Sequence, residues 1–164
     1  MSESMSGAAP EGSAQASPGE PAVLEELDEA ECLRLISPGG IGRIAFTGRF
    51  GPMVLPVNYQ LYQGTIVFRT VEDSPTDEDL RTGIANAEYR VAFEIDDFSV
   101  AAREGWSVLI QGALHHVDSA AERASVLEAG VEPWAGGSRE LFLRVIPSRI
   151  TGRRITRKPA AASG

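Results

Sequence analysis

Cysteine and histidine are almost missing from this sequence, which has one cysteine and two histidines in 164 residues. A single cysteine cannot form an internal disulfide, and the sequence contains no Cys-x-x-Cys or Cys/His spacing typical of a metal site. Cys32 lies beside apolar residues such as Leu33, so we expect it on the buried face of a helix. Its free thiol fits a reducing, cytoplasmic environment.

Long apolar runs and excess positive charge are also missing. No run approaches the ~20 apolar residues that a membrane-spanning helix needs. The first 21 residues have neither the basic segment nor the apolar core of a signal peptide. The net charge is −8. Phosphate contacts require a positive surface, so we expect neither nucleic acid nor a membrane as a partner.

The familiar catalytic motifs are absent. The sequence has no Gly-x-Ser-x-Gly, His-Glu-x-x-His, Walker or Gly-x-Gly-x-x-Gly pattern. His115 and His116 are adjacent, as are Asp96 and Asp97, and neighbours on a strand point to opposite faces. We therefore expect both pairs to be solvent-facing strand-end residues and assign no metal site. No catalytic residue can be named, and an enzyme of this kind would need an organic cofactor.

The sequence has a hydrophobic content of 43%, which is enough to form the core of one domain. Residues 1–21 are mostly Ser, Gly, Ala, Pro and Glu, which predicts a disordered tail. The domain is expected over residues 22–156, followed by a second disordered tail at 157–164. A basic cluster near the end of the chain is expected to be solvated and partly frayed. Its members are Arg149, Arg153, Arg154, Arg157 and Lys158.

Apolar residues that alternate with polar ones predict six strands. They cover residues 41–48, 53–62, 65–70, 89–96, 106–117 and 139–155. The first three are joined by the short turns "RFGP" and "QG", which predicts an antiparallel meander. Pro56 is expected at a bulge or on an edge strand, and Pro147 is expected to interrupt the last strand.

Three helices are predicted by helical spacing and by capping residues. The first covers residues 28–36, with Asp28 as its N-cap, and the second covers about 76–86, with Thr76 or Ser74 as its cap. The third covers 119–130, where Ser119 begins the helix and Gly130 ends it.

Long strands with hairpin-length connections tend to close on themselves, because closure removes exposed edges. The fold class is therefore mainly β, a small antiparallel β-barrel with peripheral α-helices. The pattern alone does not distinguish this barrel from an OB-like or SH3-like one.

Two short stretches suit a phosphorylated cofactor. In "FRT", Arg69 and Thr70 supply a cation and a hydroxyl at the end of a strand. The alternative is an arginine paired with Glu72 or Asp73 of the acidic segment that follows. In "LPVNY", a proline within a strand leaves backbone groups that could bind the edge of a flat ring, and the alternative is a bulge on an edge strand.

These stretches occur in a recognisable order: "GRIAF", "PMVLPVNY", "IVFRT", "VAFEID", "GWSVLIQGALHHV" and "RVIPSRITGRRI". The ordered set resembles the pyridoxamine 5′-phosphate oxidase-like family of FMN-binding split β-barrels. It is most similar to the branch related to nitroimidazole-resistance proteins. The resemblance covers about residues 24–155 and implies a six-stranded antiparallel split barrel. It also implies a homodimer with two FMN sites at its interface and a small-molecule substrate.

The resemblance also implies which residues bind the cofactor. One strand would offer backbone groups to the isoalloxazine ring, namely Pro56, Val57, Asn58 and Tyr59. Phe68, Arg69 and Thr70 would reach the ribityl chain and the phosphate. Trp106 and Ser107 would approach the flavin from the other subunit, with Gln111 further along the same strand.

The chain departs from the family pattern after "FRT", where many relatives have a phosphate-binding lysine. Asp77 is found where that lysine would be expected, within the acidic segment 72–79. A carboxylate near a phosphate is unfavourable. A deazaflavin, haem or no cofactor therefore stay open beside FMN.

Three functions follow from these observations. The first is an FMN-dependent oxidoreductase acting on a small aromatic or nitro-aromatic molecule. The second is a non-catalytic dimer that has lost tight FMN binding, and the third is haem binding through His115 or His116. Pyridoxamine phosphate oxidation itself is not expected, because a set of basic residues for the substrate phosphate is not evident.

Overall fold

Seven strands form in the part of the chain that a computed structural model describes, namely residues 21–71, 74–80, 89–128, 130 and 140–157. The strands are β1 (Ala22–Leu27), β2 (Gly40–Gly48), β3 (Gly51–Tyr62), β4 (Thr65–Val71), β5 (Tyr89–Ser99), β6 (Glu104–His116) and β7 (Glu140–Arg157). The helices are α1 (Glu29–Ile36), α2 (Pro75–Leu80) and α3 (Ala120–Glu128). The tails expected at 1–21 and 157–164 lie, apart from Pro21 and Arg157, outside the described residues.

The strands close into a barrel. Their order is β1-β7-β4-β3-β2-β5-β6, and β6 also pairs with β7, so six strands form a ring with every neighbouring pair antiparallel. The predicted antiparallel barrel with peripheral helices is confirmed, and so is the β2-β3-β4 meander. The QG turn between β3 and β4 has both residues at positive φ, as a type I′ hairpin turn requires, with Gln63 at 48° and Gly64 at 73°.

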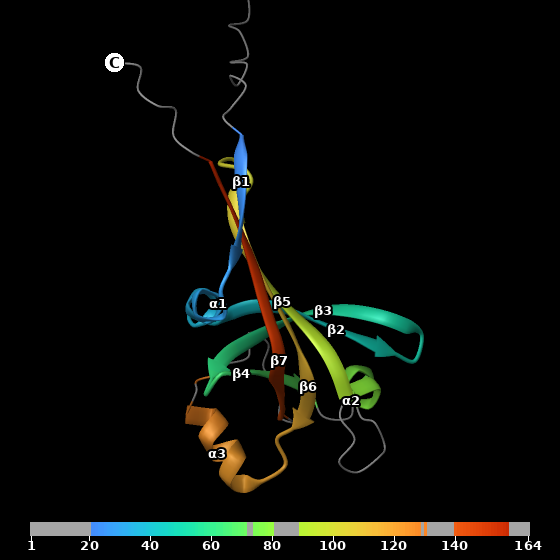
Figure 1. Cartoon of the computed structure of the whole chain (residues 1–164). Coiled ribbons are helices and arrows are strands. Elements are labelled where there is room, and N and C mark those ends of the chain that lie inside the picture. The colour runs from blue at the N-terminus through green and yellow to red at the C-terminus, as the bar shows by residue number, and fades with distance from the viewer. Residues whose placement is uncertain (1–20, 72–73, 81–88, 129, 131–139, 158–164) are drawn as a thin grey trace, which may run out of the picture.

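β1 is a seventh strand outside the ring, and the sequence pattern did not predict it. Among the described residues it pairs only with the end of β7, where Ala22 lies opposite Arg157 and Leu27 opposite Gly152. All of its residues except Leu27 are exposed, so β1 has no buried face to produce an alternating pattern. Figure 1 shows β1 and the end of β7 projecting from the barrel together with the β5–β6 hairpin.

The barrel interior is apolar, and α1 covers one of its ends. Phe93 at the centre contacts the rings of Tyr59 and Phe68 at centroid distances of 5.6 and 5.9 Å. Cys32 and Ile36 of α1 are fully buried in the same core, which confirms the prediction for Cys32. The Tyr59 hydroxyl donates a hydrogen bond to the Ile36 carbonyl at 2.9 Å, and burial raises the pKa of Tyr59 to about 12.

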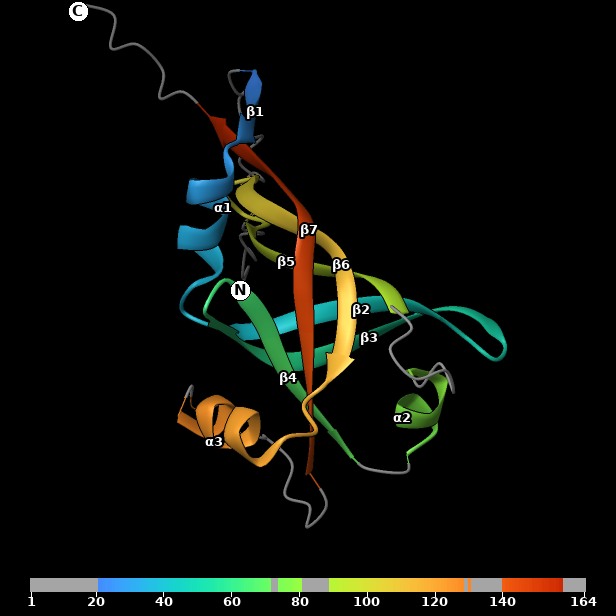
Figure 2. The ribbon, with the colours of Figure 1, turned by 60° about the horizontal axis from the view of Figure 1, so that its bottom comes forward.

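A second apolar cluster lies on the outer side of the barrel beneath α3. Val126 of α3 is fully buried against Val67, Val117 and Phe142. Figure 2 shows α3 lying along one side of the barrel, near β4 and the start of β7, and α2 lying on the opposite side. The predicted caps of α1 and α3 are confirmed, because the Glu31 N–H donates to Asp28 at 2.8 Å and the Glu122 N–H to Ser119 at 3.1 Å.

Two predictions about β7 were wrong. Pro147 does not interrupt the strand, because the pairing with β6 shifts by one residue between Gln111 and Gly112 and leaves Ser148 as an extra residue. The basic cluster is not a frayed tail either, since its four arginines belong to β7. Arg154 forms an ion pair with Glu31, and the hydrogen bonds of Glu31 to Arg34 and Arg154 lower its pKa to about 2.

Ionic contacts attach the short helix α2 to the barrel. Asp77 is fully buried and lies 3.2 Å from the Nε2 atom of His116, while Ser74 caps the helix by accepting the Asp77 N–H. Arg49 of the β2–β3 turn binds Glu78 at 2.9 Å and Asp79 at 2.7 Å. His116 was expected to face solvent, and this expectation was wrong. The strand instead directs it to a buried carboxylate, while His115 is exposed as expected.

The two adjacent histidines provide a matched test of this contact. His116→Ala leaves the buried Asp77 carboxylate without the imidazole, so the free energy of unfolding is expected to fall by about 1–3 kcal/mol. His115→Ala removes an exposed side chain and is expected to change it by less than about 0.5 kcal/mol. Urea unfolding of both variants measures the difference. Equal stability of the two variants would show that the contact with Asp77 is unimportant.

Candidate functional site

Strand alternation divides the predicted site residues between two faces of the sheet. Tyr59 and Phe68 are buried in the barrel core, and Val57 and Trp106 pack against that core. Thr70 follows the same alternation as Phe68. The other predicted residues lie on the outer face. They are Pro56, Asn58, Arg69, Ser107 and Gln111.

β3 and β4 separate at the point where the predicted cofactor residues lie. They pair only through residues 59–62 of β3, and in the described structure no strand pairs with the same edge of 51–58. Residues 69–71 of β4 likewise pair with β7 but not with β3. Pro56 lies on this open edge and pairs regularly with Arg43 of β2, which confirms the edge interpretation over the bulge.

Asn58 and Arg69 flank this split. Tyr59 lies opposite Phe68, so continuing the register by one pair places Asn58 opposite Arg69. The Asn58 Oδ1 atom is buried and accepts no hydrogen bond from the residues that the structure describes. The Arg69 guanidinium lies 5.0 Å from the centre of the Phe142 ring. A buried acceptor without a donor is unfavourable, so the split suits a bound molecule that carries an N–H or O–H group.

The side chains of Trp106 and Ser107 point to opposite faces of β6. Trp106 is half-buried against the core, whereas Ser107 lies on the outer face between Asp96 of β5 and Arg153 of β7. Of these two residues, Ser107 alone therefore shares the outer face with Asn58 and Gln111.

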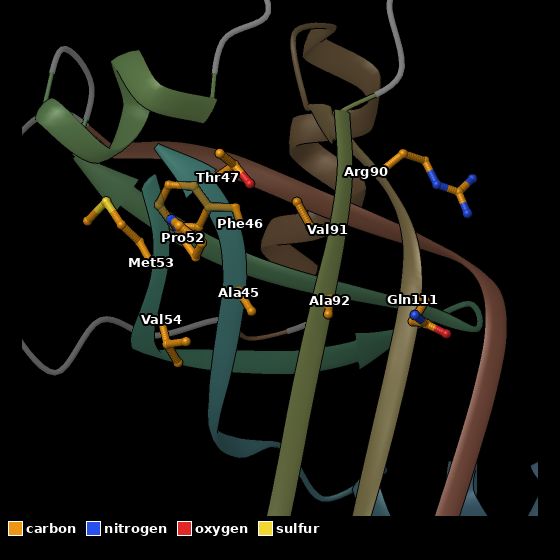
Figure 3. A pocket seen from close by; sticks show the side chains of 10 residues that line it. All are labelled: Ala45, Phe46, Thr47, Pro52, Met53, Val54, Arg90, Val91, Ala92 and Gln111. Carbon is orange, nitrogen blue, oxygen red and sulfur yellow. The ribbon is translucent and has the colours of Figure 1, made fainter. Parts of the chain in front are cut away.

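The outer face has a hollow between β3, β2, β5 and β6. In one cross-strand row, Val54 lies opposite Ala45, Ala45 opposite Ala92, and Ala92 opposite Gln111. The two central residues are alanines, so a pocket of about 390 Å³ remains between the longer side chains on either side. Its lining residues are Ala45, Phe46, Thr47, Pro52, Met53, Val54, Arg90, Val91, Ala92 and Gln111 (Figure 3).

Gln111 is the single predicted site residue that lines this hollow. The other lining residues were missed, because each is unremarkable in the sequence and only the cross-strand register brings them together. Below the hollow, Arg43 binds Glu94 at 3.0 Å and Asp96 at 3.2 Å. Burial, followed by the nearby Asp96, raises the pKa of Glu94.

The acidic segment after β4 was expected to place carboxylates near a cofactor phosphate, but its described carboxylates contact other residues of the protein. Asp77, expected where relatives have a phosphate-binding lysine, is directed inward to His116, and Glu78 and Asp79 are bound by Arg49. These three carboxylates thus contact partners within the protein. Glu72 and Asp73, the expected alternative partners of Arg69, lie outside the described residues.

Neither a metal centre nor a membrane helix is evident within the described ranges. No group of three or more His, Cys, Asp or Glu side chains is placed to hold a metal ion there. Over the same residues, every helix is too short or too polar to cross a bilayer.

Comparison with known proteins gives consistent matches. Residues 28–154 match the family model described as pyridoxamine 5′-phosphate oxidase. An uncharacterized protein of Mycobacterium tuberculosis is 32% identical over 144 residues, which cover 88% of this chain and 93% of that protein.

Solved structures share the fold. A structure described as the FAD binding protein from Mycobacterium smegmatis is 32% identical, with a TM-score of 0.65 over 79% of this chain and 98% of its own. A protein from Bacteroides thetaiotaomicron, proposed to be a 5-nitroimidazole antibiotic resistance protein, has a TM-score of 0.61 over 86% of this chain and 96% of its own. At 14% identity this second likeness concerns the fold alone. The chain belongs to the pyridoxamine 5′-phosphate oxidase family, as the order of its motifs predicted.

Proposed function

We propose that the protein binds a flavin at the split between β3 and β4 and serves as an oxidoreductase for a small aromatic molecule. The observation that carries the proposal is the open edge of β3 with the buried Asn58 Oδ1 atom beside it. Family membership supports it, and so does the 32% identical mycobacterial protein that is described as FAD binding.

The residues at the split suit the chemistry of a flavin. The flavin ring carries an N–H group and the ribityl chain carries hydroxyls, and the Asn58 Oδ1 atom would accept a hydrogen bond from one of them. Backbone groups along residues 51–58 are available to the polar edge of the ring, and Arg69 would pair with a phosphate. The bound flavin would supply the hydride or electron transfer, while the protein binds and orients it.

FMN is the form expected from the sequence resemblance, and FAD is the second candidate because of the mycobacterial relative. The two differ by an adenylate group, so the cofactor released from purified protein identifies the form. Denaturation of the protein followed by chromatography and mass spectrometry of the supernatant gives that answer. A colourless protein that binds neither FMN nor FAD in a titration would refute the proposal.

A cofactor-free dimer and a haem protein are less well supported. The case for a dimer without flavin depended on acids near the phosphate, and Asp77, Glu78 and Asp79 are bound to partners within the protein. No observation favours haem, since His116 contacts Asp77 and His115 is exposed at a strand end.

Asn58→Ala is expected to weaken flavin binding about tenfold, because it removes the acceptor at the split. Gln60→Ala is the matched control, since Gln60 lies on the same strand and face but in the part that pairs with β4. Titration of flavin-free protein, followed by quenching of flavin fluorescence, measures both affinities. An Asn58→Ala variant that binds flavin as tightly as the wild type would exclude this atom from the site.

We further propose a homodimer that forms through the outer face. Large apolar side chains are exposed there in the described part of the chain, including Ile41 at 40%, Val54 at 61% and Leu109 at 38% exposure. Exposed apolar side chains gathered on one sheet face are typical of a protein interface. Ser107 lies on the same face, as the family expectation of a shared flavin site requires.

Leu109→Glu is expected to shift the protein from dimer to monomer, because it places a charge at the centre of this face. Leu127→Glu is the control, since Leu127 is 56% exposed on α3, away from that face. Sedimentation equilibrium of the two variants measures the oligomeric state. Both variants behaving as the wild type would argue against this interface.

A further inference from the structure

The outer face carries opposite charges on the two sides of β6. Figure 3 shows β5, β6 and β7 side by side, with Ala92 on β5 and Gln111 on β6. Three cross-strand rows run over these strands: Ala92–Gln111–Arg149, Glu94–Leu109–Thr151 and Asp96–Ser107–Arg153. Both carboxylates of the rows lie on β5, both guanidinium groups lie on β7, and the β6 residues between them are uncharged. The three strands therefore present an acidic side, an uncharged centre and a basic side.

The basic side is available to a partner. Arg149 and Arg153 are exposed, and the guanidinium group of neither forms an ion pair within the part of the chain that the structure describes. Glu26 of β1 lies directly opposite Arg153 in the sheet, but no ion pair joins these two side chains there. A guanidinium group has five N–H donors and can bind a carboxylate through two of them. Both arginines can therefore bind acids of another molecule.

The acidic side keeps unused acceptor capacity. The Nη1 atom of Arg43 lies 3.0 Å from Glu94 and 3.2 Å from Asp96, so one cation is shared by two carboxylates. This group of three residues has a net charge of about −1 at neutral pH. The Asp96 side chain is 33% exposed, and a carboxylate accepts hydrogen bonds through two oxygens. Asp96 can therefore bind a second guanidinium group.

Twofold symmetry would bring the acidic side of one copy over the basic side of another. A face-to-face dimer of identical chains has its twofold axis in the plane between the copies. An axis along β6 places β5 of each copy over β7 of the other, so the row Asp96–Ser107–Arg153 meets itself in reverse order. An axis across the strands would instead place β5 over β5 and bring like charges together, which is unfavourable.

The twist of the sheets does not disturb this match. Packed sheets cross at about 30°, and neighbouring strands are about 4.8 Å apart. Residues one strand away from the axis are therefore shifted by only about 2.5 Å, which is less than the rise of one residue along a strand. Long side chains such as that of arginine reach across such a shift.

We infer that a second copy of this chain covers the outer face with β6 against β6, and that Asp96 of each copy binds Arg153 of the other. The two Leu109 side chains meet at the centre, where apolar contacts are typical of an interface. This arrangement rests on the homodimer proposed above and specifies its orientation and its ion pairs. It requires no bound flavin.

Charge reversal tests the arrangement on the full-length protein. Asp96→Arg and Arg153→Asp each place like charges at two symmetry-related contacts, so the dissociation constant of the dimer is expected to rise about tenfold to hundredfold. The double variant restores opposite charges at both contacts and is expected to dimerise within about threefold of the wild type. Sedimentation equilibrium measures the constants.

Two controls make the same charge changes elsewhere. Glu128→Arg lies on α3 and Arg103→Asp lies in the β5–β6 turn, and both residues are exposed. Each control is expected to leave the dissociation constant within about threefold of the wild type. If a charge-reversed variant fails to fold, Asp96→Asn and Arg153→Gln replace the pair. Their double variant is then expected to dimerise no more weakly than the weaker single variant, because both remove the same contact.

Mixing the two charge-reversed variants gives an independent measurement. The Asp96→Arg chain presents two arginines and the Arg153→Asp chain presents two aspartates, so opposite charges meet only in a mixed dimer. Mixed dimers are therefore expected at concentrations where each variant alone is monomeric. Native mass spectrometry identifies them, because their mass differs from that of either homodimer.

The outcomes separate this arrangement from the earlier proposals. Dimerisation that is unaffected by charge reversal, or a mixture that stays monomeric, would overturn the arrangement. The homodimer itself would still stand if Leu109→Glu produced monomers in the same experiment. A wild-type protein that is monomeric at every concentration would overturn both, and a different partner would then cover the face. Flavin binding is measured separately and is decided by neither result.

Discussion

The pairing of β7 with two barrel strands at once is the constraint on which the rest of the structure depends. β7 pairs with β4 on one side and with β6 on the other, and so closes the ring. Closure encloses the Phe93 core and sets the register that brings Gln111 beside Arg149. Without this double pairing, neither a closed interior nor an organised outer face would exist.

Closure leaves the two sides of each strand with different tasks. Inward residues such as Tyr59 and Phe68 fill the core, so only their backbone remains available to a ligand. Outward residues such as Asn58 and Gln111 do not belong to the apolar core, so their side chains can bind a ligand. The order of the motifs along the sequence does not distinguish inward from outward residues, since neighbours on a strand stand together in the sequence.

Much of the fold could be predicted from the sequence, and the reasons are local. The meander from β2 to β4, the caps Asp28 and Ser119 and the burial of Cys32 follow from alternation and from short-range hydrogen bonds. β1 could not be predicted, because a strand exposed on nearly all positions carries no pattern and forms only through contact with β7. The prediction that Asp77 lies near a phosphate failed because its orientation also depends on a distant contact, since its partner His116 is 39 residues away in sequence. The hollow depends on two alanines that only the register between β2 and β5 brings together.

The position of β7 after the other six strands has a consequence for biosynthesis. The strand at residues 22–27 pairs with residues 152–157, which are synthesised after all the other strands. The ring therefore cannot close on the ribosome until residues 140–157 have emerged. Until then, β4 and β6 each present an unpaired edge, the kind of surface that chaperones protect and that promotes aggregation. Contacts this distant in sequence also slow folding.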